Sequence, residues 1–127
     1  MAQSWRQQAL IETPTANTMA DGIAVRVHNS TVYIAGQVAN NTTQNTRDQT
    51  AEILSIIDKL LAQAGSSKSH ILMATIYLAD LADYADMNAA WYAWVAPQHS
   101  PCRATLNAKP AKSEWKVEII VTAAVAI

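Results

Sequence analysis

The chain has 127 residues, of which half are hydrophobic and 15% charged, and its formal net charge is -1. This length suits one folded domain with a real core, and the composition excludes an extended disordered region and argues against a nucleic-acid-binding protein. The apolar stretches are too short to span a membrane. Cys102 is the one cysteine. No internal disulfide can therefore form, and because no basic-then-apolar leader is visible we expect a cytoplasmic protein.

The N-terminal third predicts an arm followed by a β-hairpin. Residues 1–20 show no sustained period and contain a proline, so we expect a loosely attached arm or an edge strand. Apolar and polar residues alternate over residues 23–27, turn residues follow at 28–31, and residues 32–38 resume the strand pattern. Gly36 interrupts this second strand, as glycines do at a bulge or where a ligand or another backbone approaches the main chain.

Two segments carry helical periodicity. Apolar residues recur at three- and four-residue spacing from Ile53 to Ala64, and Gly65 follows as a left-handed stop. A second helix is expected between Asp80, which supplies a cap, and Pro97. Its apolar stripe is interpreted as a core face and not as a cofactor platform. The stripe consists of Tyr84, Met87, Trp91, Trp94 and Val95.

The remaining segments complete a sheet. Residues 70–79 form a nearly continuous apolar run, typical of a central strand covered on both faces. Two strands are expected within the closing segment, residues 101–120. The predicted order is strand, strand, helix, strand, helix, strand, strand. This order indicates an α/β (α+β) fold over residues 1–127, with two helices packed on one face of a mixed sheet.

The last two strands each carry one full charge, Arg103 and Glu118. If the polar loop of residues 109–113 closes them as a hairpin, the two charges lie directly opposite each other. One interpretation is a structural ion pair. The other is a ligand site, because a guanidinium on an apolar sheet is costly unless its donors are used, and its fork suits a carboxylate. Glu118 would then orient or deprotonate a water, and Thr105 would add a hydroxyl.

Other catalytic patterns are missing from the sequence. The three glycines form no phosphate-binding loop, and the three histidines show no metal-ligand spacing, so neither a cofactor nor a metal is expected. Cys102 lies three residues after His99, a separation that puts the two on opposite faces of an extended strand. A small buried thiol is therefore expected at Cys102 in preference to a nucleophile.

Residues 101–125, PCRATLNAKPAKSEWKVEIIVTAAV, resemble the closing segment of the RidA (YjgF-like) reactive intermediate deaminases, and are most similar to the YoaB-like branch. Residues 33–38, YIAGQV, and residues 71–95 resemble further parts of that family. The residues that carry the signature are Pro101, Arg103, Lys116 and Glu118. Two positions depart from the family pattern: Thr105 replaces a cysteine, and Gly22 aligns with a tyrosine.

The resemblance implies a chorismate-mutase-like fold that assembles as a homotrimer, with sites in the clefts between subunits. It implies hydrolysis of 2-imino and enamine acids to 2-oxo acids and ammonia, without a cofactor. Arg103 would hold the substrate carboxylate, the main chain of Gly36 would form a hydrogen bond near it, and Glu118 would position the water. The alternative is a non-catalytic trimer that binds a small carboxylate or acts as a chaperone. Neither nucleic acid nor a membrane is expected as a partner.

Overall fold

The computed structural model describes residues 23–126, which form one five-stranded sheet and two α-helices. The expectations for residues 1–20 and for Gly22 lie outside the described residues. The predicted order of strands and helices is confirmed. The elements are β1 (Val25–His28), β2 (Thr31–Gln37), α3 (Thr46–Gln63), the short 3₁₀ helix η1 (Lys68–His70), β3 (Ile71–Leu78), the 3₁₀ helix η2 (Leu81–Asp83), α4 (Tyr84–Trp94), β4 (Cys102–Asn107) and β5 (Val117–Ala124).

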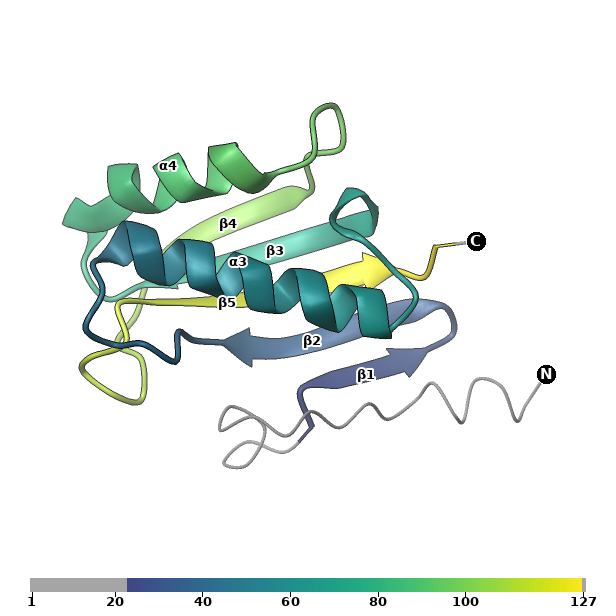
Figure 1. Ribbon diagram of the computed structural model, residues 1–127, viewed down its shortest axis with the longest axis horizontal. Helices are drawn as coiled ribbons and strands as arrows, with labels where there is room; N and C mark the ends of the chain where they lie inside the picture. Colours follow the sequence, from purple (N-terminus) through teal and green to yellow (C-terminus); the bar gives the residue numbers. More distant parts are fainter. Residues whose placement is uncertain (1–22, 127) are drawn as a thin grey trace.

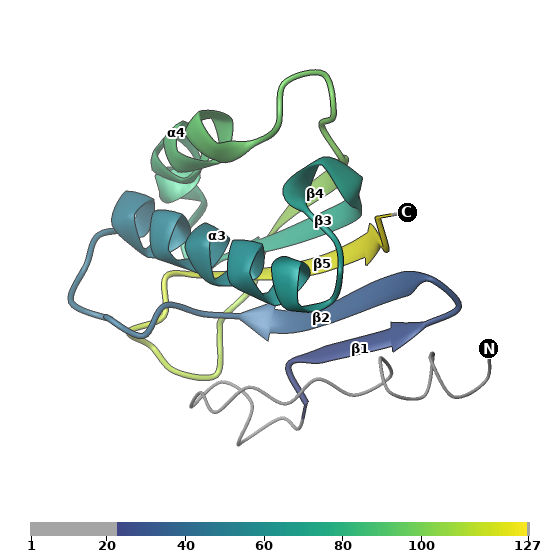
Figure 2. The ribbon, with the colours of Figure 1, turned by 45° about the vertical axis from the view of Figure 1, so that its right-hand side comes forward.

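The two helices lie on the same face of the sheet, as Figure 1 and the rotated view in Figure 2 both show. Helix α3 begins at Asn45, whose side chain accepts a hydrogen bond from the Asp48 N–H (2.8 Å). Its last residue is Gln63, and the chain leaves the helix through Gly65, where φ is 75° and after which the Ser66 N–H donates back to the Leu61 carbonyl (2.8 Å). No helix of residues 23–126 is long and apolar enough to cross a membrane.

The strand order across the sheet is β1-β2-β5-β3-β4, and β3 with β4 is the parallel pair. The predicted hairpin between β4 and β5 is therefore wrong, because β3 lies between them and pairs with both. Parallel strands need a crossover connection, and α4 supplies one between β3 and β4. The long segment from 108 to 116 then carries the chain past β3 to the far side of that strand.

The core lies between the sheet and the helices, and the opposite face of the sheet is uncovered within one chain. Alternate residues of β5 and β3 are buried beneath the helices, whereas Tyr33, Met73 and Leu106 are 50%, 37% and 48% exposed. The prediction that β3 is covered on both faces is therefore wrong for the single chain. Cys102 is also exposed, which contradicts the expected buried thiol. Its strand, β4, is at the edge of the sheet, where less of the fold covers it.

Candidate functional site

Arg103 points toward the helices. It pairs in register with Ala74, a fully buried residue of the face that the helices cover. Its guanidinium carbon lies 5.2 Å from the ring centre of Trp91 and 6.0 Å from that of Tyr92. Its Nη2 donates a hydrogen bond to the Tyr84 hydroxyl (3.4 Å). The rings of Trp91 and Tyr92 and the Tyr84 hydroxyl therefore hold the cation by contacts that favour a positive charge.

Three buried side-chain atoms of the described residues have no hydrogen-bond partner, and they come from these two elements. They are Asn88 Oδ1, Arg103 Nη1 and Thr105 Oγ1. Arg103 and Thr105 share one face of β4, as predicted, and Asn88 lies one helical turn after Tyr84. Leaving a buried polar group unpaired costs about 1–3 kcal/mol. A ligand with its own polar atoms can satisfy them, and we call this set, Tyr84, Asn88, Arg103 and Thr105, the arginine half-site.

Tyr84 is electrostatically coupled to this half-site. A hydrogen bond from Asn88 and the positive charge of Arg103 lower the pKa of the Tyr84 hydroxyl below its ordinary value of 10.0, because both favour the phenolate. Desolvation acts in the opposite direction and is the weaker effect. The phenol is therefore a better hydrogen-bond donor than an isolated tyrosine.

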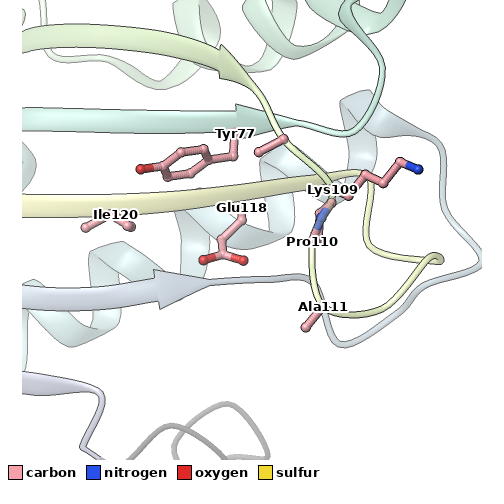
Figure 3. Close-up of a pocket in the computed structure, with 7 residues that line it drawn as sticks. Tyr77, Lys109, Pro110, Ala111, Glu118 and Ile120 are labelled. Carbon is pink, nitrogen blue, oxygen red and sulfur yellow. The ribbon is translucent and has the colours of Figure 1, made fainter.

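Glu118 lies on the uncovered face of the sheet. It pairs in register with Tyr77 of β3 and lines a hollow of about 290 Å³. Figure 3 shows the Glu118 carboxylate and the Tyr77 ring on the same side of the strands, with the loop that carries Lys109 and Pro110 at one end. The amino group of Lys109 points away from the carboxylate in this view. This glutamate half-site can hold a small polar molecule against the carboxylate.

Gly36 makes room for Glu118. The pairing of β2 with β5 is irregular between Ile34 and Gln37, as expected from a glycine inside a strand. A Cβ on Gly36 would collide with Glu118 Oε2 and would lie 2.9 Å from Cδ of that carboxylate. Space for the carboxylate therefore requires glycine here, whereas the backbone of Gly36 is not in the left-handed region.

The structure brings some of the predicted site residues together and separates others. Gly36 adjoins Glu118, and Thr105 shares the face of Arg103. The predicted juxtaposition of Arg103 and Glu118 is wrong, because β3 separates their strands and they point to opposite faces of the sheet. A structural ion pair between the two within one chain is thereby overturned. The ligand interpretation stays a prediction.

Sequence reasoning missed the contributions of Tyr84 and Asn88. Tyr84 was assigned to the core stripe of the second helix, but it is 46% exposed, whereas Met87 and Trp91 of that stripe are buried as predicted. The available signal was helical spacing: Tyr84, Asn88 and Trp91 lie at positions i, i+4 and i+7 of one helix and so share one side. What the sequence did not indicate is that this side meets Arg103.

Comparisons with known proteins give consistent matches. The sequence pattern of the family described as Endoribonuclease L-PSP matches residues 13–125. A RutC family protein of Haemophilus ducreyi is 50% identical, over 80% of this chain and 86% of that protein. RutC family protein YoaB of Escherichia coli is 48% identical, over 80% of this chain and 88% of that protein.

Two further comparisons extend these matches to a solved structure and to a relative whose name states an activity. The crystal structure of a YjgF family member from Neisseria meningitidis superposes with a TM-score of 0.83 at 40% identity, over 87% of this chain and 92% of that one. The chloroplastic Reactive Intermediate Deaminase A of Arabidopsis thaliana is 30% identical, over 74% of this chain and 54% of that protein.

Proposed function

Since the chain belongs to the RidA (YjgF-like) family, we propose that it hydrolyses 2-imino and enamine acids to 2-oxo acids and ammonia, without a cofactor, in the cytoplasm. The name of the Arabidopsis relative, Reactive Intermediate Deaminase A, supports this activity. The observation that carries the proposal is that Arg103 is held in place without a negatively charged partner within residues 23–126. Its guanidinium rests on aromatic rings, its contacts among the described residues include no carboxylate, and Nη1 is buried without a partner. A planar anion is the ligand that such a fork recognises.

We further propose that the active site forms between subunits of a homotrimer. Arg103 and Glu118 point to opposite faces of one sheet, so a small ligand cannot contact both within one chain. A site that uses both charges therefore needs the arginine half-site of one subunit and the glutamate half-site of another. The uncovered sheet face, with Tyr33 and Met73 exposed, supplies apolar surface for such an association.

In the proposed reaction, Arg103 binds the substrate carboxylate by two parallel hydrogen bonds, and the Thr105 hydroxyl contributes a third. Glu118, held against the main chain of Gly36, accepts a proton from a water molecule as the water oxygen attacks C2 of the imine. The electron pair of the C=N bond moves to nitrogen, which takes up the proton from Glu118 and so regenerates the carboxylate. The hydroxyl proton of the tetrahedral adduct then passes to the amino nitrogen, by way of Glu118, as the C2–N bond breaks. Ammonia leaves, the C2–O bond becomes a carbonyl, and a 2-oxo acid remains.

The test is the release of ammonia and 2-oxo acid from imines that an amino acid oxidase generates in situ, with semicarbazide as a competing trap. We expect the full chain to accelerate hydrolysis, and Arg103→Ala and Glu118→Ala to abolish the acceleration. Arg47→Ala and Glu114→Ala are matched controls, because both residues are exposed and lie outside the two half-sites. Activity unchanged in Glu118→Ala would contradict the proposed role of that carboxylate.

A non-catalytic carboxylate-binding protein is the alternative outcome of the same experiment. It would be supported if the wild-type trimer bound a 2-oxo acid through Arg103 but did not accelerate imine hydrolysis. RNA cleavage, which the family description names, is not proposed for this chain. A net charge of -1 offers no excess of cations for binding a phosphate backbone.

A further inference from the structure

The Tyr84 hydroxyl lies beside the Nη2 edge of Arg103. Tyr84 is the first residue of α4, and its ring is 46% exposed although its hydroxyl is 3.4 Å from Arg103 Nη2. The side chain therefore reaches from the helix to the guanidinium at the solvent-accessible side of the arginine half-site. An anion bound at Nη2 would therefore lie next to this hydroxyl.

The hydrogen-bond pattern at the phenol oxygen leaves its hydrogen available. Arg103 carries donors only, so the oxygen of Tyr84 accepts in their contact. Asn88 Oδ1, the nearby acceptor of the helix, has no hydrogen-bond partner and so does not accept from Tyr84. Among the described residues the Tyr84 O–H therefore donates to no acceptor. It can donate to an anion bound beside Nη2.

Within residues 23–126 no other phenol lies in this position relative to Arg103. Tyr92 also lies over the guanidinium, but its ring centre is 6.0 Å from the guanidinium carbon and no hydrogen bond joins the two side chains. Thr105 Oγ1 and Arg103 Nη1 are buried, on the inner side of the half-site. Tyr84 is thus the outer donor of a half-site whose other unpaired donors face inward.

We infer that Tyr84 is a further ligand-binding residue, and that its hydroxyl donates a hydrogen bond to the carboxylate oxygen held at Arg103 Nη2. The inference rests on the proposed function for the class of ligand, a small 2-oxo or 2-imino acid. Within that class, Tyr84 selects for an anionic group, because a phenol that donates to a charged acceptor loses a strong hydrogen bond when the acceptor is neutral.

The experiment measures the dissociation constant of 2-oxobutanoate for the full chain by calorimetry, in wild type, Tyr84→Phe and Ser55→Ala. Tyr84→Phe keeps the ring and removes the hydroxyl, and Ser55→Ala removes a hydroxyl from the exposed side of α3, away from both half-sites and from the uncovered face of the sheet. We expect Tyr84→Phe to weaken binding roughly tenfold, which is the effect of losing one hydrogen bond to a charged group. Ser55→Ala should bind as wild type does.

A second readout separates ligand contact from a merely structural role. Tyrosinate absorbance, taken as the difference between wild type and Tyr84→Phe, should titrate at higher pH when 2-oxobutanoate is bound, because the anion opposes loss of the phenol proton. If the chain hydrolyses an imine, Tyr84→Phe should raise the KM for that imine and leave kcat nearly unchanged.

The outcomes separate this inference from the proposed function. A dissociation constant for Tyr84→Phe within twofold of wild type overturns the inference, as does an absence of 2-oxobutanoate binding to wild type. If wild type binds the acid with the expected dependence on Tyr84 but does not accelerate imine hydrolysis, the deaminase proposal fails while the inference holds.

Discussion

Each charged residue of the candidate site depends on an uncharged neighbour. Arg103 is held by the rings of α4, which keep its planar fork in one place without neutralising it. Glu118 lies against β2 because Gly36 has no side chain. The aromatic rings carry no charge that could neutralise Arg103, so its guanidinium keeps its capacity to bind an anion.

The space at Gly36 leads to a prediction about activity. Gly36→Ala places a methyl group on the Glu118 carboxylate and should displace it, because the collision is with the carboxylate itself. We expect imine hydrolysis to fall by about 100-fold or more, the range of a lost general base. The measurement is the rate of 2-oxo acid release by a variant whose circular dichroism matches wild type.

Gly65→Ala is the matched control for this substitution. A Cβ at Gly65 would have ordinary contacts, with Val125 Cγ1 at 3.8 Å, but φ is 75° at this helix end. The left-handed backbone should lower the free energy of unfolding by about 1–2 kcal/mol and leave activity per folded molecule intact. If both alanine variants lost the same activity, the cause would be a general effect on the fold and not displacement of the Glu118 carboxylate.

The lowered pKa of Tyr84 leads to a prediction about pH. The neutral phenol donates to a bound carboxylate, whereas the phenolate repels it, so affinity should fall as pH rises through the pKa. The charged group that faces the phenol from the sheet is Arg103, and its helix neighbour Asn88 is uncharged. We expect the decline in 2-oxobutanoate affinity to have its midpoint below pH 10.0. Tyr84→Phe should remove this decline, and a persisting decline would assign the titration to another group.

At the scale of elements, a buried glutamine connects α3 to the start of the strand that carries Glu118. The side chain of Gln49 is fully buried, accepts from the Lys116 N–H (3.0 Å) and donates to the Glu114 carbonyl (3.2 Å). Residue 116 is two positions before Glu118, so this pair of hydrogen bonds fixes where β5 begins beneath the helix layer. Packing of α3 and placement of the glutamate half-site are therefore linked.

Gln49→Leu should destabilise the fold. The substitution keeps the volume roughly constant but leaves the Lys116 N–H and the Glu114 carbonyl without their partner. We expect the free energy of unfolding, measured with urea, to fall by about 2–3 kcal/mol. Gln63→Leu is the control, because that glutamine is exposed on the same helix. A loss of similar size in both variants would argue against the role of the buried hydrogen bonds.

At the scale of the whole molecule, the main feature is the face of the sheet that neither α-helix covers. Tyr33, Met73 and Leu106 expose large apolar side chains there, on three different strands. Helices cover only the other face, as Figure 2 shows. An extended apolar surface of this kind is typical of a protein–protein contact, which agrees with the proposed trimer and with a site that needs two subunits.

Met73→Glu should disrupt this association. A carboxylate in the centre of the uncovered face would be desolvated on assembly, and the cost opposes subunit contact. We expect light scattering to give a smaller species than wild type, and imine hydrolysis to fall with it. Ser55→Glu, on the exposed side of α3, should change neither. A wild-type chain that is monomeric at all concentrations would overturn the trimer and the shared site together.

The helices and strands, and which residues of a strand share a face, could be predicted from the sequence, because both depend on local periodicity. Helical spacing ending at Gly65 predicted α3, and alternation along β4 correctly placed Arg103 and Thr105 on one face. The glycine of β2 correctly indicated a bulge, and the group that lies close to it is the side chain of Glu118 and not another backbone. The residues of the closing segment likewise indicated the family, which the comparisons confirm.

The relation between strands had to come from the tertiary structure. Alternation says which residues of one strand share a face, but it does not say which strand lies beside which. Pairing of β3 with both β4 and β5 is a long-range choice that buries the central apolar strand, and it separates Arg103 from Glu118. The sequence by itself thus determined the elements and their polar residues. Only the packed sheet decided that the two charges face opposite ways, because strand neighbours depend on contacts between distant segments.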